Sequence, residues 1–165
     1  VWNIDKVNLD RNKNNKLDYI LIEGEQTHFD AVRRTNGFLE SSQNLPLNQL
    51  TNLSADWQRN LSSVKFSKLD TSIIQSAEAI ICNNDDMALG AWEALEEKGC
   101  TEVQVVGIDG IEEVRELVDE DKILGSVLCD TKLHAKALMQ FIDVLAFHNG
   151  SVEKLNLENE RLNSV

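Results

Sequence analysis

The sequence lacks the features that would assign the chain to a membrane or to a nucleic acid. No apolar run reaches the eighteen or so residues that are needed to span a bilayer, and the first residues do not have the pattern of a secretion signal. Basic residues are few, because 16 Lys and Arg stand against 28 Asp and Glu and leave a formal net charge of -12. Nucleic acids and anionic membranes repel such a chain, so we predict no nucleic-acid partner and no direct membrane span. A neutral or cationic ligand fits this charge better.

Cysteines are also few, and their number is odd. Cys82, Cys100 and Cys129 show no C-x-x-C spacing, which argues against both a zinc knuckle and a disulfide framework. The glycine-rich signatures of dinucleotide, nucleotide and acyl-transfer sites are absent as well. We therefore expect a binding function rather than an enzyme.

The sequence does contain an alternation of short β-rich runs with longer amphipathic runs. Its length of 165 residues and 42% hydrophobic content suit a single domain, residues 1–165. The predicted strands cover residues 19–24, 48–54, 79–84, 103–109 and 124–130, with a further edge strand at 152–157. The predicted helices cover residues 30–42, 56–70, 85–98, 111–119 and 131–148. This pattern predicts an α/β fold of three layers, with a doubly wound parallel sheet.

Polar and aromatic residues follow the predicted strands. Ligands of open parallel sheets bind beyond the carboxyl ends of the strands, so these residues are the candidates for a site. Carboxylates, amides and a guanidinium can each bind two neighbouring hydroxyls, and an aromatic ring can cover the apolar face of a sugar. Such a set is present here: Asp30, Arg34, Trp57, Asn84 and Asp109. Asp109 is the strongest single candidate, because a carboxylate that ends an apolar strand needs a partner.

Each of these residues also has a simpler interpretation. Asp30 and Arg34 could form an ordinary i, i+4 ion pair on a helix. Trp57 could belong to the core at the start of an amphipathic helix. Asn84 and Asp85 could cap the helix that follows them, and Asn84 could cap and bind at once.

The stretch DRNKNNKLD, residues 10–18, alternates oxygen-bearing side chains with lysines and other residues. Such a stretch is compatible with a solvated polar turn or with a site for a hard cation, which prefers oxygen ligands.

Several stretches resemble one known family. HFDAVRRT, ICNNDDMALGAWEAL, VVGIDG and GSVLCDTKLHAKA are similar, in order and spacing, to the second half of the periplasmic glucose/galactose-binding proteins. DRNKNNKLDYILIEGE is similar to the calcium loop of that family and to the strand after it. The resemblance implies one lobe, the C-terminal one, of a type I periplasmic-binding-protein fold, in which a monosaccharide lies between two lobes. The N-terminal lobe is then missing from this chain.

The resemblance also implies roles for individual residues. The implied sugar contacts are His28, Asp30, Arg34, Trp57, Asn84 and Asp109. The implied ligands of a structural Ca²⁺ are Asp10, Asn12, Asn14, the Lys16 carbonyl, Asp18 and a bidentate Glu78. Asn15 stands where an EF-hand has glycine, and asparagine tolerates the same left-handed turn. Cys129 replaces an asparagine contact of the family, which leaves the identity of the sugar open.

The function implied by the resemblance is that of an extracytoplasmic receptor, periplasmic or lipid-anchored at the cell surface. Its partners would be a monosaccharide and either the membrane permease of an ABC transporter or a chemoreceptor. The alternative is the effector-binding core of a cytoplasmic, sugar-responsive transcriptional repressor, which shares the fold and which unpaired cysteines favour. An enzyme with Asp109 or Asp30 as nucleophile or base is disfavoured, because no neighbouring base has an evident spacing.

Overall fold

The computed structural model describes residues 9–147, and in this range all five predicted strands form. The described residues fall into two units, one that ends at Leu128 and one that starts at Cys129. The strands are β1 Leu17–Glu23, β2 Leu47–Ser54, β3 Ala79–Cys82, β4 Gln104–Asp109 and β5 Gly125–Leu128. The helices of the first unit are α2 Phe29–Ser41, α3 Arg59–Ser67, α4 Thr71–Ser76, α5 Asp85–Lys98 and α6 Glu112–Asp119.

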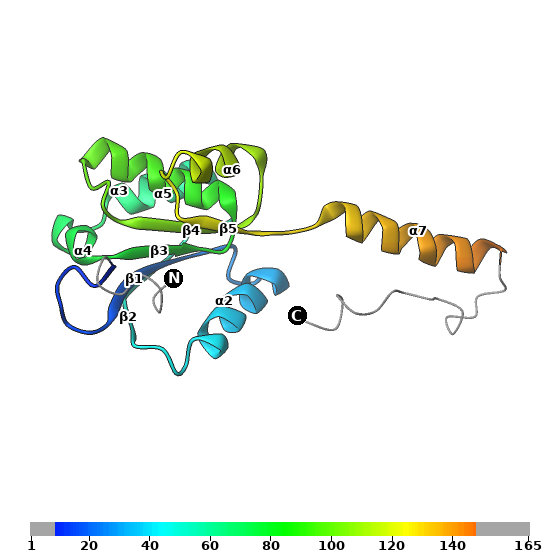
Figure 1. Cartoon of the computed structure of the whole chain (residues 1–165), viewed down its shortest axis with the longest axis horizontal. Helices are drawn as coiled ribbons and strands as arrows, with labels where there is room; N and C mark the ends of the chain where they lie inside the picture. The colour runs from blue at the N-terminus through cyan, green and yellow to red at the C-terminus, as the bar shows by residue number, and fades with distance from the viewer. Residues whose placement is uncertain (1–8, 148–165) are drawn as a thin grey trace. The chain divides into compact units, whose positions relative to one another are not determined.

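The strands form one parallel sheet in the order β2-β1-β3-β4-β5. Helix α2 covers one face of this sheet, and α3, α5 and α6 cover the other (Figure 1). This arrangement confirms the predicted three-layer α/β fold. The chain runs outward from β1 to β2 and then crosses back to β3, so the strand order reverses between β1 and β3. In open parallel sheets, the carboxyl ends of the strands at such a reversal form a natural ligand crevice.

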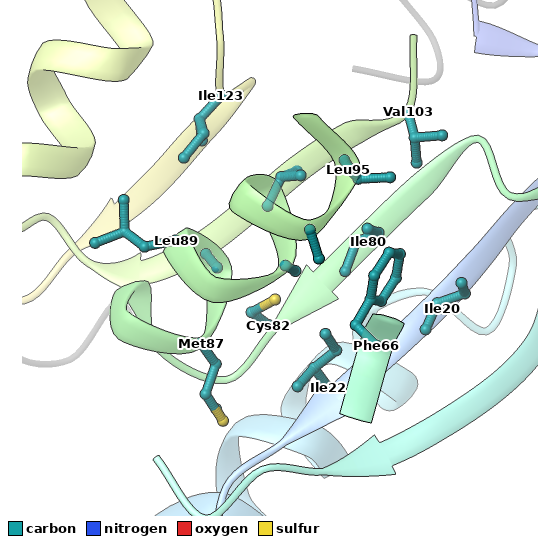
Figure 2. Packing of buried hydrophobic residues seen from close by; sticks show 14 of the residues in the cluster. Ile20, Ile22, Phe66, Ile80, Cys82, Met87, Leu89, Leu95, Val103 and Ile123 are labelled. Atoms are coloured by element: carbon teal, nitrogen blue, oxygen red, sulfur yellow. The ribbon is translucent and has the colours of Figure 1, made fainter. Parts of the chain in front are cut away.

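The larger hydrophobic core lies between the sheet and helices α3 and α5. Alternate residues of β1 point to opposite faces of the sheet, so Ile20 and Ile22 enter this core while Tyr19 and Leu21 enter a smaller cluster on the other face. Figure 2 shows the packing in the larger core of Ile20, Ile22, Phe66, Ile80, Cys82 and Leu89. Each fully buried side chain of the size of isoleucine or phenylalanine stabilises the fold by about 1.5–3 kcal/mol.

The predicted helix over residues 56–70 is wrong in its bounds. Asp56 and Trp57 have φ values of 49° and 67°, which no α-helix allows, so α3 starts only at Arg59. A second, unpredicted helix, α4, begins after Asp70, whose carboxylate accepts a hydrogen bond of 2.8 Å from the Ser72 amide. Helix α3 ends at Ser67 and Asp70 caps α4, and an amphipathic pattern does not show this break.

The second unit contains helix α7, Thr131–Phe147, which agrees with the predicted helix over 131–148. Asp130 accepts a hydrogen bond of 2.9 Å from the Leu133 amide at its start. The predicted edge strand at 152–157 lies outside the described residues. Within residues 9–147, none of the helices is both long and apolar enough to cross a membrane.

Candidate functional site

One pocket brings together all the side chains that the sequence predicts as sugar contacts. The pocket has a volume of about 290 Å³ and is lined by His28, Asp30, Arg34, Trp57, Asn84 and Asp109. These residues come from the start of α2, the turn before α3, the residue before α5 and the end of β4. The convergence at the carboxyl ends of β1, β2, β3 and β4 is therefore as predicted, and a role in binding sugar stays a prediction.

Arg34 and Asp109 form an ion pair across the pocket. Arg34 Nη1 lies 3.0 Å from Asp109 Oδ1 and also donates a hydrogen bond of 2.7 Å to the backbone oxygen of Asn83. Arg34 thus pairs with a residue 75 positions away rather than with Asp30 one turn earlier on its own helix. Burial raises the pKa of the Asp109 carboxyl, and the neighbouring Arg34 guanidinium offsets part of this rise.

The indole of Trp57 forms an aromatic wall of the pocket. A Cβ atom added to Gly24 would overlap the indole ring, so the end of β1 needs glycine for the ring to lie where it does. The His28 ring meets the indole edge to face, with 5.5 Å between the centroids, and the Arg34 guanidinium carbon lies 5.5 Å from the ring centroid. Trp57 also packs against the larger core, as its simpler interpretation predicts, while its role as a sugar contact stays a prediction.

Two of the pocket residues also cap helices. Asn84 Oδ1 accepts a hydrogen bond of 3.0 Å from the Met87 amide and caps α5, which confirms the predicted capping role. His28 Nδ1 accepts a hydrogen bond of 3.3 Å from the Asp30 amide and caps α2. This bond leaves Nε2 as the hydrogen-bond donor of a neutral His28 ring.

Asn83 holds several parts of the site together, a role that the sequence did not predict. The buried Asn83 Oδ1 accepts hydrogen bonds from the Gly24 amide at 3.1 Å and the Thr35 hydroxyl at 3.2 Å. Its backbone oxygen receives the Arg34 guanidinium. Asn83 therefore joins the end of β1, helix α2 and the Arg34 side chain. Its place directly after an apolar strand was the available signal.

The loop of residues 10–18 leads into β1, which begins at Leu17, and so lies at the opposite, amino-terminal edge of the sheet. Asp10 accepts hydrogen bonds from the Asn14 and Asn15 amides at 3.0 and 2.9 Å. Glu78, which directly precedes β3, accepts from the Asp18 amide at 3.0 Å, from the Asn12 amide at 3.3 Å and from the Arg11 amide. Asn15 has a φ of 64°, which confirms the predicted left-handed turn.

The carboxylates that surround this loop are buried, and amide groups in the described part of the chain donate hydrogen bonds to them. Asp18 accepts hydrogen bonds from the side-chain amides of Asn12, Asn14 and Asn48 at 2.6, 2.8 and 2.6 Å. Asp10, Asp18 and Glu78 are at most 9% exposed, and no Lys or Arg among residues 9–147 forms an ion pair with any of them. The Lys16 amide donates to Asn14 Oδ1 at 2.7 Å.

The donor chemistry of the loop fits a hard cation, although the present contacts are hydrogen bonds. In the described part of the chain, no three His, Cys, Asp or Glu side chains form a group arranged to hold a metal ion. Each carboxylate oxygen has about two lone pairs, so acceptor capacity remains beside the bonds from the loop amides. Three carboxylates and the amide oxygens are the ligand types that Ca²⁺ prefers.

Cys129 belongs to the second unit. Its thiol is free and half-exposed. The thiols of Cys82 and Cys100 are free and buried in the first unit.

Comparison with known proteins gives consistent matches. A family model described as a periplasmic binding protein domain matches residues 8–149. The D-galactose/methyl-galactoside binding periplasmic protein MglB of Haemophilus influenzae is 32% identical over 148 residues, which make up 88% of this chain and 44% of that protein. The chain therefore spans less than half the length of this relative.

Solved structures share the fold. The crystal structure of a galactofuranose binding protein matches with a TM-score of 0.74 at 19% identity, over 91% of this chain and 50% of that chain. A dimeric Lac repressor matches with a TM-score of 0.71 at 21% identity, over 82% of this chain and 49% of that chain. Identities this low show the fold alone.

The family is one of binding proteins, which confirms the prediction that the chain is not an enzyme. The sequence match over residues 8–149 and the parallel sheet with its flanking helices lead to one conclusion: the chain belongs to the periplasmic binding protein family.

Proposed function

We propose that this chain is the C-terminal, sugar-binding lobe of an extracytoplasmic receptor that delivers a monosaccharide to an ABC transporter. The observation that carries the proposal is the pocket in which all six predicted contacts meet. The relative from Haemophilus influenzae, named for binding D-galactose and methyl-galactoside, makes galactose and glucose the first sugars to test.

The pocket offers a distinct group for each part of a sugar. The paired Arg34 and Asp109 present a donor fork beside a carboxylate, a combination that suits two adjacent hydroxyls. Asn84 adds an amide at the start of α5, and the Trp57 indole supplies a flat apolar wall for C–H bonds. A sugar that lacks one of the matched hydroxyls would leave a polar group of the pocket unpaired, which is the basis of discrimination.

The proposed whole receptor needs a second lobe. The match to 44% of the relative's length supports a partner lobe of about equal size that closes over the pocket. The missing contacts make sugar binding by this chain alone weak, with a dissociation constant of about 1 mM or more, equivalent to roughly 4 kcal/mol of binding free energy. The permease or a chemoreceptor would then recognise the closed pair of lobes.

The test is a titration of the chain with D-galactose and D-glucose, followed by amide chemical shifts in NMR. We expect millimolar binding with shifts centred on Trp57 and Asp109, and loss of saturation in Trp57→Ala. Glu97→Gln, on the exposed face of α5, is the matched control and should bind like the wild type. Micromolar affinity would contradict the two-lobe account, and unchanged binding by Trp57→Ala would contradict the pocket.

A structural Ca²⁺ in the loop of residues 10–18 is a second part of the proposal. Asp10, Asn12, Asn14, the Lys16 carbonyl, Asp18 and Glu78 would hold the ion, whose charge would replace N–H donors around three buried carboxylates. An ion that binds only the folded chain stabilises it by about 2.7 kcal/mol at a concentration one hundred times its dissociation constant.

Melting curves with calcium, magnesium or a chelator test this part. We expect the melting temperature to rise with calcium more than with magnesium, because the loop offers many oxygens in a flexible arrangement. Asn14→Asp should tighten calcium binding, since it adds a carboxylate at an exposed loop position. Equal melting temperatures in calcium and in chelator would exclude the ion.

The alternative function is the effector-binding core of a sugar-responsive repressor. Three free thiols favour it, because reduced cysteines are common in the cytoplasm. The loop of buried carboxylates counts against it, since a repressor core does not need a cation loop. The gene segment upstream of this chain separates the two: a signal peptide or lipobox supports the receptor, and a helix-turn-helix supports the repressor.

A further inference from the structure

The turn that carries Asp109 has an unusual backbone. Asp109 has a φ of 132° and the next residue, Gly110, has a φ of 71°. Positive φ values are uncommon outside glycine and persist where the surrounding structure holds them. The contacts of this turn should therefore show what fixes the Asp109 carboxylate in the pocket.

Both backbone amides after Asp109 are held by one pair of side chains. The Ile111 amide donates to Asp85 Oδ2 at 2.9 Å. The Gly110 amide donates to Ser126 Oγ at 3.0 Å, and the Ser126 hydroxyl in turn donates to Asp85 Oδ1 at 2.6 Å. One carboxylate oxygen of Asp85 thus binds the turn directly, and the other binds it through the Ser126 hydroxyl.

The Asp85 side chain is built into this place. It is fully buried at the first position of α5, and a Cβ atom on Gly107 of β4 would overlap its Oδ1. No Lys or Arg of residues 9–147 forms an ion pair with it. Its oxygens accept hydrogen bonds from the Ile111 amide and the Ser126 hydroxyl, and it lies at the amino-terminal end of α5, where the helix dipole favours a carboxylate.

Helix capping does not explain these contacts. The cap of α5 is Asn84, whose side chain accepts the Met87 amide, so the capping position is already filled by the residue before Asp85. The hydrogen bonds of Asp85 lead away from its own helix, to the turn after β4 and to β5. A buried carboxylate with both oxygens committed to one turn serves that turn.

We propose that Asp85, together with Ser126, is a positioning residue that fixes the Asp109–Ile111 turn so that the Asp109 carboxylate meets Arg34 across the pocket. Asp85 does not line the pocket and acts on a ligand only through Asp109. The consequence for sugar binding rests on the proposed function, whereas the positioning of the turn does not.

The first test is Asp85→Asn in the full chain, read by amide hydrogen exchange without sugar. The amide group of asparagine accepts with one oxygen only, so we expect exchange at Gly110 and Ile111 to become about tenfold faster, equivalent to the loss of one buried hydrogen bond. The amide of Val105, near the start of β4, should keep its wild-type rate. Asp86→Asn is the matched control, because it removes the same charge from the next, exposed residue of α5. Equal acceleration at Val105, or acceleration in Asp86→Asn as well, would overturn the proposal.

A second pair of variants decides the matter if Asp85→Asn does not fold. Ser126→Thr keeps the hydroxyl and Ser126→Val replaces it with a methyl of the same shape, on a strand that accepts β-branched residues. We expect Thr to retain slow exchange at Gly110 and the wild-type NMR signal of the Arg34 guanidinium, and Val to lose both. Identical behaviour of the two variants would refute the role of the hydroxyl.

Titration with D-galactose then links the turn to binding. We expect the dissociation constant to increase about tenfold in Asp85→Asn and in Ser126→Val, and to stay near the wild-type value in Ser126→Thr. Wild-type chain that binds neither galactose nor glucose would refute these two sugars as ligands of this lobe, while the exchange and guanidinium measurements would still decide the positioning role. Wild-type affinity in Ser126→Val together with fast exchange would refute the link to binding.

Discussion

The two edges of the sheet use the same kinds of side chain in opposite ways. At the amino-terminal edge, Asp10, Asp18 and Glu78 are buried, and amides of the loop and of neighbouring asparagines surround their oxygens. At the carboxyl-terminal edge, the Asp109 and Arg34 side chains keep 31% and 25% of their surface exposed and line an open pocket. Carboxylates thus organise backbone at one edge and remain available for a ligand at the other.

The reason for the difference lies in how the contacts are made. The bonds that Asp10 accepts from the loop join residues four and five positions apart, so the loop folds around its own acceptor. Glu78 then ties the loop to the start of β3, from 60 or more positions away. The pocket joins segments far apart in sequence, such as Arg34 and Asp109, which meet only once the sheet has formed. We therefore expect changes in the loop to affect stability first, and changes in the pocket to affect binding first.

The largest effect should come from Glu78→Gln. The buried Glu78 accepts the amides of Arg11, Asn12 and Asp18, and a glutamine would turn an NH₂ group toward one of these donors. We expect a loss of roughly 2–4 kcal/mol in the free energy of unfolding, the range for breaking a buried hydrogen-bond network. Urea unfolding of the chain measures it.

Glu97→Gln is the control for this change, because Glu97 is exposed on α5. It should alter the free energy of unfolding by no more than about 0.5 kcal/mol. Sugar affinity of the folded Glu78→Gln chain should match the wild type. A loss of affinity with little change in stability would reverse the assignment of the two edges.

A change of intermediate size is expected for Gly24→Ala at the other edge. The new methyl group would overlap the Trp57 indole and displace it from the pocket wall. We expect the dissociation constant for galactose to increase about tenfold, equivalent to 1.4 kcal/mol, with a smaller change in stability. Calorimetric or NMR titration gives the affinity.

Two comparisons sharpen this prediction. Gly37→Ala lies on the exposed side of α2 with nothing near the added methyl, and should leave binding unchanged while stabilising the helix by about 0.5–1 kcal/mol. In a Trp57→Ala background the Gly24 change should have no further effect on the free energy of unfolding, because the clashing ring is gone. Additive losses in the double variant would show that Gly24 acts without the indole.

The sequence predicts much of this molecule because local rules and global topology agree in most places. The alternation of apolar runs predicts the parallel sheet, and the rule for strand ends predicts that Asp30, Trp57, Asn84 and Asp109 converge. Position along the strands does not reveal pairing partners, so Arg34 could be assigned to Asp30 as readily as to Asp109. The break between α3 and α4 depends on backbone angles at Asp56, Trp57 and Asp70, which an amphipathic pattern does not encode.

Asp85 shows a different limit. An aspartate at the start of a helix is typical of a cap, but the cap of α5 is the residue before it, Asn84. Only the folded chain shows that β4 and β5 bring Gly107 and Ser126 against its carboxylate. Residues whose roles arise from packing between distant strands are thus the ones that sequence patterns assign to the nearest local motif.

The smallest effect, on stability and dependent on pH, is expected for Asp109→Asn. The pKa of Asp109 is raised above its ordinary value of 3.8, chiefly by burial, so the folded chain holds this proton more tightly than the unfolded chain does. Ionisation then disfavours folding: there is no penalty well below pH 3.8, and the penalty grows as the pH rises through the folded pKa.

Asparagine cannot ionise, so the variant should gain stability relative to the wild type across this range and keep the gain at neutral pH, although its sugar binding is weakened. Urea unfolding of both proteins over a series of pH values measures the difference. If the variant instead becomes less stable than the wild type as the pH rises, the ion pair with Arg34 outweighs the cost of burial. The Asp109 carboxylate would then stabilise the fold, as the carboxylates of the loop do.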